Sequence, residues 1–555
     1  MRAKSGLFKG LNPTVTIVSV AIVLAFVVLC ATLGDQAAHA FKIASDAILD
    51  NFKWFYLALV SGLLGALILI AVSRYGTLKL GREGDKPEFS FPAWISMLFS
   101  AGMGIGLIFW SVAEPVLHYS SNPFSKGLTD ESATTAMRLT LFHWGLHPWA
   151  IFTTIGLGLA YFAYCKGLPL ALRSVLYPLI GQRIYGPIGH AVDIMGVCIT
   201  AFGVSQSLGL GVVQINTGLN QVFQIPVSMG LQLGIIALVS LIAAVSLVAG
   251  VSRGMKRLSI LNMWMSFGLM LVVLALGPTR YVMNFLFEST GDYLQHLVGL
   301  SFWTDTQANS SWQKSWTAFY WPWWMTWGPF VGLFIARISR GRTIRELIIG
   351  ALLVPTLVTI LWMSVFGGSA LKDEQNARIA SAQQVSSQDN ATAPFQGGVI
   401  LQATQKETTS AMFTLLERLD GPTIGGMLCV LVCLLLAVHF VTTADAGTQV
   451  LCMLNSVGSI NPPNWIRVLW CFLEGAIAGG LLLAGGLAAI QLASIVIGLP
   501  IALFLLVTAY SLLRSLREDT VWPVQTLMMR PAINDVSLRP ETGQLLTQPT
   551  HREMA

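Results

Sequence analysis

The sequence of 555 residues predicts an all-α membrane protein in which two leading helices precede two inverted repeats of five transmembrane helices. Three observations predict this fold class: an apolar composition, twelve long apolar runs, and interruptions that recur five runs apart. Hydrophobic residues make up 54% of the chain and charged residues only 11%. The mean hydropathy of +0.66 lies far above that of a soluble globular chain.

Twelve apolar runs of about 20 residues are long enough to cross a bilayer as helices. They lie near 13–34, 53–74, 90–116, 134–165, 188–218, 228–251, 258–277, 315–337, 343–369, 423–450, 465–488 and 489–514. Between the seventh and eighth runs, residues 278–314 are amphipathic and carry several charges, which predicts an interfacial helix and loop. The seven cysteines lie in or beside apolar runs without a CxxC pair, which indicates core packing.

The distribution of positive charge predicts the orientation. Most of the 33 Lys and Arg residues fall in loops that are cytoplasmic if the N-terminus lies inside. We therefore expect cytoplasmic segments at 1–12 and 515–555, two leading helices within 13–89, and a location in the cell inner membrane. The largest outer loop, 370–422, is rich in Gln, Ser, Thr and Ala and is expected to be a flexible surface loop.

The internal repeat is predicted from the third and eighth runs, which lie five runs apart and are both interrupted by Gly or Pro near the middle. A repeat with an odd number of helices inverts its second copy, as in transporters that bind substrate at mid-membrane between two repeats. The expected repeats cover 90–277 and 315–514.

The eighth run opens with "SWTAFYWPWWMTWGPF", residues 315–330, and concentrates aromatic rings. The run measures about 35 Å at 1.5 Å per residue, so its middle falls near Met325. For Trp312, Trp316 and Trp321 we expect positions in the interfacial aromatic belt. Trp323, Trp324 and Trp327 lie near mid-bilayer and on one helix face together with Tyr320, which predicts a wall of rings; packing alone is the alternative.

Two other runs place unusual residues at the same depth. The third run has "SAGMGIG" at 100–106, where three glycines predict a broken helix that lines a cavity, with close helix packing as the alternative. The fourth run has "HWGLHPWAIF" at 143–152, which brings further rings to mid-membrane. The residues concerned are Gly102, Gly104, Gly106, Trp144, Trp149 and Phe152.

A ring-lined cavity without a carboxylate of its own suits a quaternary ammonium, because ring faces attract its diffuse charge. Glu114, His118, His147 and Asp193 are interpreted as structural or gating groups. The sequence has no HExxH, no GxSxG and no clustered His and Asp, so it does not predict an enzyme. Large rings would also occlude the open polar path of a channel.

The segments "GMGIGLIFWSVAEP", "HWGLHPWAIF" and "SWTAFYWPWWMTWGPFVGLFIARISRGRTIRE" resemble the betaine/carnitine/choline transporter family. Over about 10–515 the resemblance implies twelve helices of the amino-acid-transporter (LeuT-like) type, often in a homotrimer within membrane lipid. It implies transport of trimethylammonium compounds and related zwitterions by cation symport or by exchange. The implied substrate and pathway residues are Trp144, Trp149, Phe152, Trp324, Trp323, Trp327, Gly102, Met103, Gly104, Gly106 and Phe334.

The resemblance also bears on the coupling ion. Sodium-coupled members are similar to this chain at Gly106, where proton-coupled choline transporters tend to have aspartate. One implied sodium site consists of Ser100, Met103, Thr442 and Thr443, although the two threonines could instead bond back to their own helix. A second implied site, with Thr200 and Phe330, is doubtful because Val204 replaces a threonine, and Phe152 stands where a tyrosine is frequent.

The sequence therefore predicts a symporter of a betaine-like compatible solute, glycine betaine first and choline or carnitine next, with one coupling ion. Sodium is the first choice and a proton the second. Proton-coupled or exchange transport of choline, carnitine, ectoine or a sulfonium analogue is the alternative. Exchangers of the family that dispense with sodium use a buried arginine, and none lies in the interior of the fifth, seventh or eighth run. Beyond the coupling ion no cofactor is expected, and no nucleic-acid partner.

Overall fold

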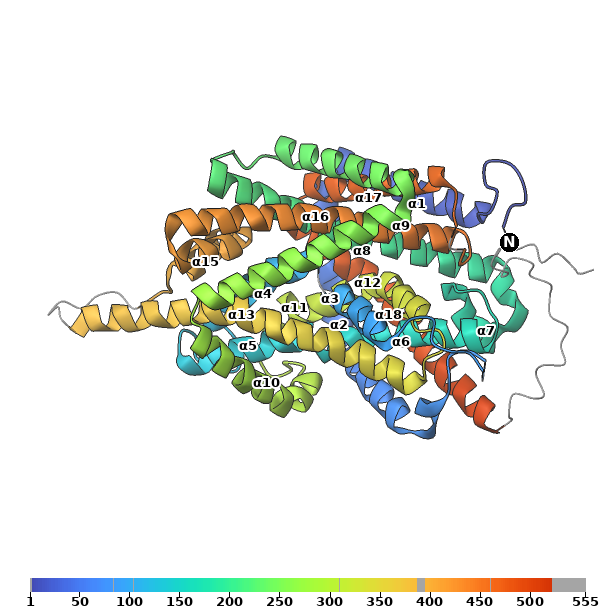
Figure 1. Cartoon of the computed structure of the whole chain (residues 1–555), viewed down its shortest axis with the longest axis horizontal. Helices are drawn as coiled ribbons and strands as arrows, with labels where there is room; N and C mark the ends of the chain where they lie inside the picture. The colour runs from blue at the N-terminus through green and yellow to red at the C-terminus, as the bar shows by residue number, and fades with distance from the viewer. Residues whose placement is uncertain are drawn as a thin grey trace, which may run out of the picture. The chain divides into compact units, whose positions relative to one another are not determined.

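A computed structural model of the chain is helical almost throughout (Figure 1). It describes residues 2–82, 84–102, 104–308, 310–386, 395–459 and 461–521, with the backbone alone at 101, 102, 249–256, 384–386, 422, 520 and 521. Within these residues there is no β-sheet, only two isolated bridges. Met1–Leu512 form one compact unit, and Leu513 begins a second, of which the structure describes the last turns of one helix.

The α-helices follow one another with few long connections. The first nine are α1 Pro13–Leu33, α2 Asp35–Val72, α3 Phe91–Gly102, α4 Ile105–Ser120, α5 Asp130–Trp144, α6 Leu146–Ala160, α7 Tyr177–Ile180, α8 Pro187–Phe223 and α9 Met229–Leu276. The others are α10 Thr279–Phe302, α11 Ser311–Ser315, α12 Thr317–Ile338, α13 Ile344–Ser386, α14 Val399–Lys406, α15 Ala411–Leu419, α16 Gly421–Asn455, α17 Asn464–Leu483 and α18 Gly486–Val521.

Every predicted span corresponds to a helix. In the described part of the chain ten helical segments are long and apolar enough to cross a membrane, and the bent pair α3 and α4 makes an eleventh. The twelfth is α12, whose 22 residues also suffice to span a bilayer. Its hydropathy is lowered by Trp, Tyr and Pro, although indole rings are largely apolar. The predicted all-α membrane fold is thus confirmed.

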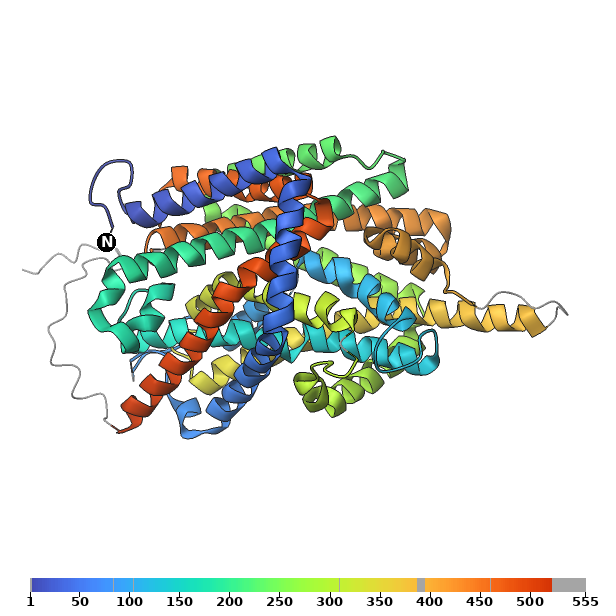
Figure 2. The same cartoon turned by 180° about the vertical axis from the view of Figure 1, so that it is seen from behind.

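Two predicted boundaries were wrong. α2 begins at Asp35, well before the apolar run, and Figure 2 shows the chain turning sharply between α1 and α2 at Gly34, which has φ +46°. The sixth and seventh runs form one continuous helix, α9, whose two arms meet at a bend in Figure 1. No proline separates the two arms, and glycine alone does not end a helix that neighbours support.

The outer segment 370–422 is also not the flexible loop that its composition predicted. α13 continues through it to Ser386, and α14 and α15 follow; residues 387–394 lie outside the described part. The buried carboxylate of Glu374 accepts hydrogen bonds from the backbone of Gly398 at 2.6 Å and Leu401 at 2.9 Å. Together with the buried apolar side chains of α14 and α15, such as Leu401 and Phe413, this anchoring orders the segment.

The two interrupted runs behave differently. The third is broken as predicted: α3 ends at Gly102, α4 begins at Ile105, and the two axes differ by 60°. The eighth is not broken, because α12 passes through Pro322 and Pro329 without interruption. Each proline removes one backbone hydrogen bond, which a membrane helix tolerates when neighbouring helices surround it.

The contacts between helices recur when each helix of the first five-helix repeat is matched with its counterpart in the second. α6 packs on α12 in the same way that α13 packs on α4, α9 contacts α16 as α17 contacts α8, and α8 and α16 contact each other. This reciprocity is the packing expected of two inverted repeats around a common centre.

Glycines bring α6 and α12 close together. A Cβ on Gly156 would lie 2.9 Å from the Ile335 side chain, and one on Gly332 would lie 2.6 Å from Ile155. Small residues at a membrane helix interface permit this approach. The consequence for the site is that the rings of α6 and α12 meet across a short gap.

Candidate functional site

A cavity lies where the broken helix, the α5–α6 junction and α12 meet. It has about 550 Å³ of empty volume, counting the part open to solvent. Its lining consists of Gly104, Gly106, Leu107, Trp144, Pro148, Trp149, Phe152, Ser207, Trp323, Trp324, Trp327, Val331 and Thr359. Eight of the residues that the sequence predicted for substrate are therefore in one place, and none of the described lining residues is charged.

The rings enclose the cavity from three helices. The indole of Trp324 lies 4.9 Å from that of Trp323, stacked, and 4.8 Å from that of Trp144, edge to face. From α6, Phe152 faces Trp324 edge to face at 6.1 Å and Trp149 at 5.3 Å. Ring centroids at 4.5–7 Å in these orientations are favourable pairs, so the wall is held by its own contacts.

The glycines of the broken helix differ in what surrounds them. A Cβ on Gly106 would lie 2.8 Å from the ring of Trp323 and 3.3 Å from that of Trp144, whereas a Cβ on Gly104 would meet no atom within 4 Å. Gly106 thus allows two cavity rings to approach the backbone. Gly102 ends α3, only its backbone is described, and Met103 lies outside the described residues.

We therefore expect Gly106→Ala to lower the rate of substrate uptake by at least about fivefold, because overpacking of this size costs roughly 1–3 kcal/mol. The matched variant Gly104→Ala adds the same methyl group to open space and should have a much smaller effect. Initial uptake rates, normalised to the amount of protein in the membrane, test the difference. Equal losses in both variants would contradict the packing role of Gly106.

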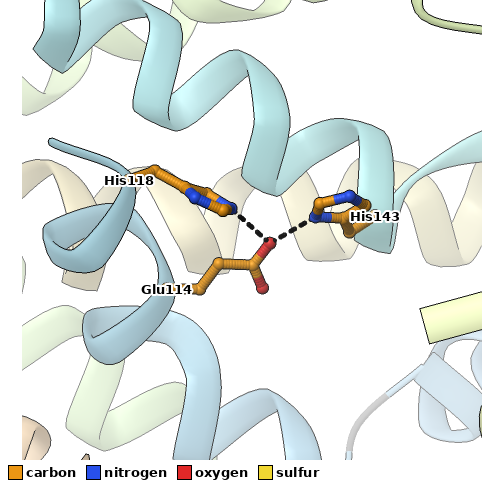
Figure 3. A group of neighbouring side chains, drawn as sticks. All are labelled: Glu114, His118 and His143. Atoms are coloured by element: carbon orange, nitrogen blue, oxygen red, sulfur yellow. Dashed lines mark hydrogen bonds and ion pairs between the residues drawn. The ribbon is translucent and has the colours of Figure 1, made fainter. Parts of the chain in front are cut away.

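A buried carboxylate lies directly behind the ring wall. Glu114 Oε1 is contacted by His143 Nδ1 at 2.7 Å and His118 Nε2 at 3.3 Å, and Figure 3 shows both rings directed at this one oxygen. Glu114 Oε2 accepts from Trp144 Nε1 at 2.7 Å and from the Tyr320 hydroxyl. All these side chains are buried, and four donors offset much of the cost of a carboxylate at this depth.

The same cluster also fixes Trp324, whose Nε1 donates to the backbone oxygen of His143 at 2.9 Å. His143 Nε2 in turn lies 3.0 Å from Thr317 Oγ1. The nitrogens of His118 and His143 and an oxygen of Glu114 lie within 4.8 Å of one another, a spacing that a metal ion can bridge. Because each of these atoms already serves a hydrogen bond, the arrangement is a positioning network for two cavity tryptophans.

The sequence interpretation missed this role of Glu114. The residues that meet there are far apart in the chain, and only the i, i+4 spacing of Glu114 and His118 was visible. The belt position expected for Trp321 is wrong: its ring is buried and stacks on His147 at 5.5 Å. Trp312 and Trp316 are half-buried and pack against His118.

The residues implied for a first sodium site are not joined by any hydrogen bond within the described part of the chain. Ser100 is exposed near the end of α3, and Met103 is not described. Thr442 Oγ1 donates to the backbone oxygen of Val438 in its own helix at 3.0 Å and accepts from Asn262 Nδ2 at 3.2 Å. Thr443 is half-buried on the next position of α16.

The residues of the doubtful second site and of the pathway lie outside the cavity lining. Thr200 is buried on α8 with its hydroxyl unpartnered, and Phe330 packs edge to face on Trp327 at 5.6 Å. Val204 packs on Gly447, where a Cβ would lie 2.8 Å away, so it supplies only methyl groups. Phe334 is half-buried farther along α12.

Two polar groups in the cavity were not predicted as hydrogen-bond donors. Ser207 Oγ on α8 and Trp327 Nε1 on α12 are buried and have no partner among the described residues. Buried donors are normally paired, so these two are available to a bound molecule that carries an acceptor.

Comparisons with known proteins agree on one family. The family model described as "BCCT, betaine/carnitine/choline family transporter" matches residues 14–521. The probable glycine betaine transporter of Desulfitobacterium hafniense is 41% identical, covering 91% of this chain and 98% of its own. The glycine betaine transporter OpuD of Bacillus subtilis is 41% identical (87% and 89%), and the high-affinity choline transport protein of Escherichia coli 39% (92% and 72%).

Proposed function

The chain belongs to the betaine/carnitine/choline transporter family, and we propose that it carries glycine betaine into the cell across the cytoplasmic membrane. Membership makes it a multi-pass transporter of compatible solutes and not an enzyme. The proposal concerns the particular substrate, the tryptophan site and the coupling ion.

The observation that carries the proposal is the cavity wall of Trp144, Trp149, Phe152, Trp323, Trp324 and Trp327 without a charged side chain. A trimethylammonium group donates no hydrogen bonds, so it gains little from oxygen ligands and is attracted by ring faces. Each cation–π contact contributes about 0.5–2 kcal/mol when desolvated. Three or four rings thus offset the hydration that the head group loses.

The free donors of Ser207 and Trp327 favour a substrate with an anionic end. A carboxylate accepts hydrogen bonds from both an O–H and an N–H group, and such bonds are stronger than those to a hydroxyl. This favours glycine betaine over choline, and two of the relatives named above are a glycine betaine transporter and a probable glycine betaine transporter. Choline is the second candidate because its head group is the same and a third relative transports it.

For the coupling ion we propose sodium, bound by Ser100, Met103, Thr442 and Thr443 once the broken helix approaches α16. Gly106, where an aspartate would favour a proton, supports this choice. Thr200 and Phe330 are not expected to hold a second ion, because Val204 offers no oxygen. A proton remains the alternative ion. We further propose that both termini are cytoplasmic and that the protein assembles as a homotrimer.

The experiment is uptake of labelled glycine betaine, choline, carnitine and ectoine by transport-deficient cells that express the chain. Saturable uptake, highest for glycine betaine and reduced when sodium is replaced by potassium, is the expected result. Absence of uptake for every trimethylammonium compound would overturn the substrate proposal. Uptake that does not depend on sodium and requires an acidic exterior would show that the coupling ion is a proton.

A further inference from the structure

Two buried carboxylates lie outside the cavity and have no role in the function proposed above. Asp445 on α16 and Glu474 on α17 are both fully buried. Asp445 lies about three turns before the end of α16, and Glu474 lies about three turns after the start of α17, so the connection between the helices brings them to a similar depth. An ionisable side chain inside a membrane is costly and marks a functional site by default.

Neither carboxylate is satisfied. Ser246 Oγ of α9 donates to Asp445 Oδ2 at 2.8 Å, and Thr448 Oγ1 donates to Glu474 Oε2 at 3.1 Å. Asp445 Oδ1 and Glu474 Oε1 have no hydrogen-bond partner, and neither residue forms an ion pair within the described part of the chain. Two buried carboxylate oxygens without a partner require a metal cation or a bound proton to offset the cost of burying their charge.

The two carboxylates belong to one site. Thr448, which bonds Glu474, lies three residues after Asp445 and therefore on the same side of α16. Gly447 allows the Glu474 carboxylate to approach the backbone of α16, since a Cβ at Gly447 would lie 2.9 Å from Glu474 Oε1. Both helices also pack on α9 and on α8, which encloses the pair.

The other charged or titratable groups nearby do not supply the cation. Arg467 lies about two turns from Glu474 toward the start of α17, and its Nε has no partner. On α8, Asp193 is paired with Arg173 at 2.6 Å, and on α16, His439 bonds Asn262 at 2.8 Å. The other titratable side chains on α8, α16 and α17 are His190 and the thiols of Cys198, Cys429, Cys433, Cys452 and Cys471. α9 carries Arg253, Lys256 and Arg257, and the side chains of the first two lie outside the described part of the chain.

We propose that Asp445 and Glu474 together bind a monovalent cation, a proton or a sodium ion, whose movement is coupled to transport. The inference deepens the proposed function and rests on it. It is distinct from the sodium site proposed above, because the Thr442 hydroxyl is bonded to Asn262, whereas Asp445 bonds Ser246. Carboxylate and hydroxyl oxygens are ligands that both cations accept.

The test compares Glu474→Gln and Asp445→Asn with the wild type in proteoliposomes that contain the full chain. Labelled glycine betaine uptake is driven by a sodium gradient in one arm and by an acidic exterior in the other, and gradient-free exchange of labelled for unlabelled betaine is measured alongside. Gradient-driven uptake should fall roughly tenfold or more in both variants, and exchange should fall far less. The arm in which the wild type responds and both variants lose the response identifies the cation of this site.

The control is Glu374→Gln, a buried carboxylate whose two oxygens are both bonded to backbone amides. It should retain the wild-type dependence on the gradient. Unchanged gradient dependence in Glu474→Gln and Asp445→Asn, or an equal fall of uptake and exchange in these folded variants, would overturn the inference. A wild type that does not exchange betaine at all would instead overturn the proposed substrate.

A binding measurement tests the site without transport. A cation that binds only the folded protein raises its melting temperature further as the cation concentration increases. We expect Tm of the purified wild-type protein to rise with sodium chloride relative to potassium chloride, or with acidity, and this rise to be smaller in Glu474→Gln. Equal rises in both proteins would count against the site.

Discussion

Trp324→Leu is expected to raise the apparent KM for glycine betaine by about twofold to thirtyfold, the range that corresponds to one cation–π contact of 0.5–2 kcal/mol. Trp324 contacts rings from all three helices that form the wall. It stacks on Trp323 of α12 and faces Trp144 of α5 and Phe152 of α6 edge to face. Leucine fills part of the volume but has no ring face. Concentration-dependent uptake of labelled betaine measures the change.

The matched control is Trp264→Leu, since the Trp264 side chain on α9 is 62% exposed and lies outside the cavity. This control makes the same tryptophan-to-leucine change at another position and should leave the KM for glycine betaine unchanged. Trp324→Phe keeps a ring and should give an intermediate KM. If Trp324→Leu reaches the membrane in normal amounts and its uptake kinetics match the wild type, the ring wall does not bind the head group.

The ring wall could be predicted from the sequence because depth and helix periodicity are local properties. A run with known ends fixes which residues lie near its middle, and a period of 3.6 fixes which of them share a face. Trp323, Trp324 and Trp327 satisfied both conditions and line the cavity. The glycines at 102–106 likewise marked the break between α3 and α4, because three glycines within five residues weaken a helix at that point.

The support of the wall could not be predicted in this way. Glu114, Trp144 and Tyr320 meet from three helices, and no spacing within one run indicates such a contact. The composition of 370–422 wrongly predicted a flexible loop, since buried hydrogen bonds such as those of Glu374 help to order this segment. Trp321 has the sequence pattern of a belt residue, yet the neighbouring helix covers it.

Glu114→Gln is expected to raise the apparent KM for glycine betaine by about tenfold or more and to lower Tm. An amide has only one acceptor oxygen, and its N–H₂ group meets donors where the carboxylate accepted Trp144 Nε1 and the Tyr320 hydroxyl or the two histidines. Each donor left without a partner costs about 1–3 kcal/mol. Trp144 and, through His143, Trp324 then lose their fixed orientation around the substrate.

Glu374→Gln is the matched control for this variant, because it removes the charge of another fully buried carboxylate but acts far from the rings. It should lower Tm without changing the KM, which separates loss of stability from loss of positioning. Glu114→Asp keeps the charge on a shorter chain and should recover part of the affinity. A Glu114→Gln variant with lowered Tm and an unchanged KM would show that the carboxylate stabilises the fold without orienting the wall.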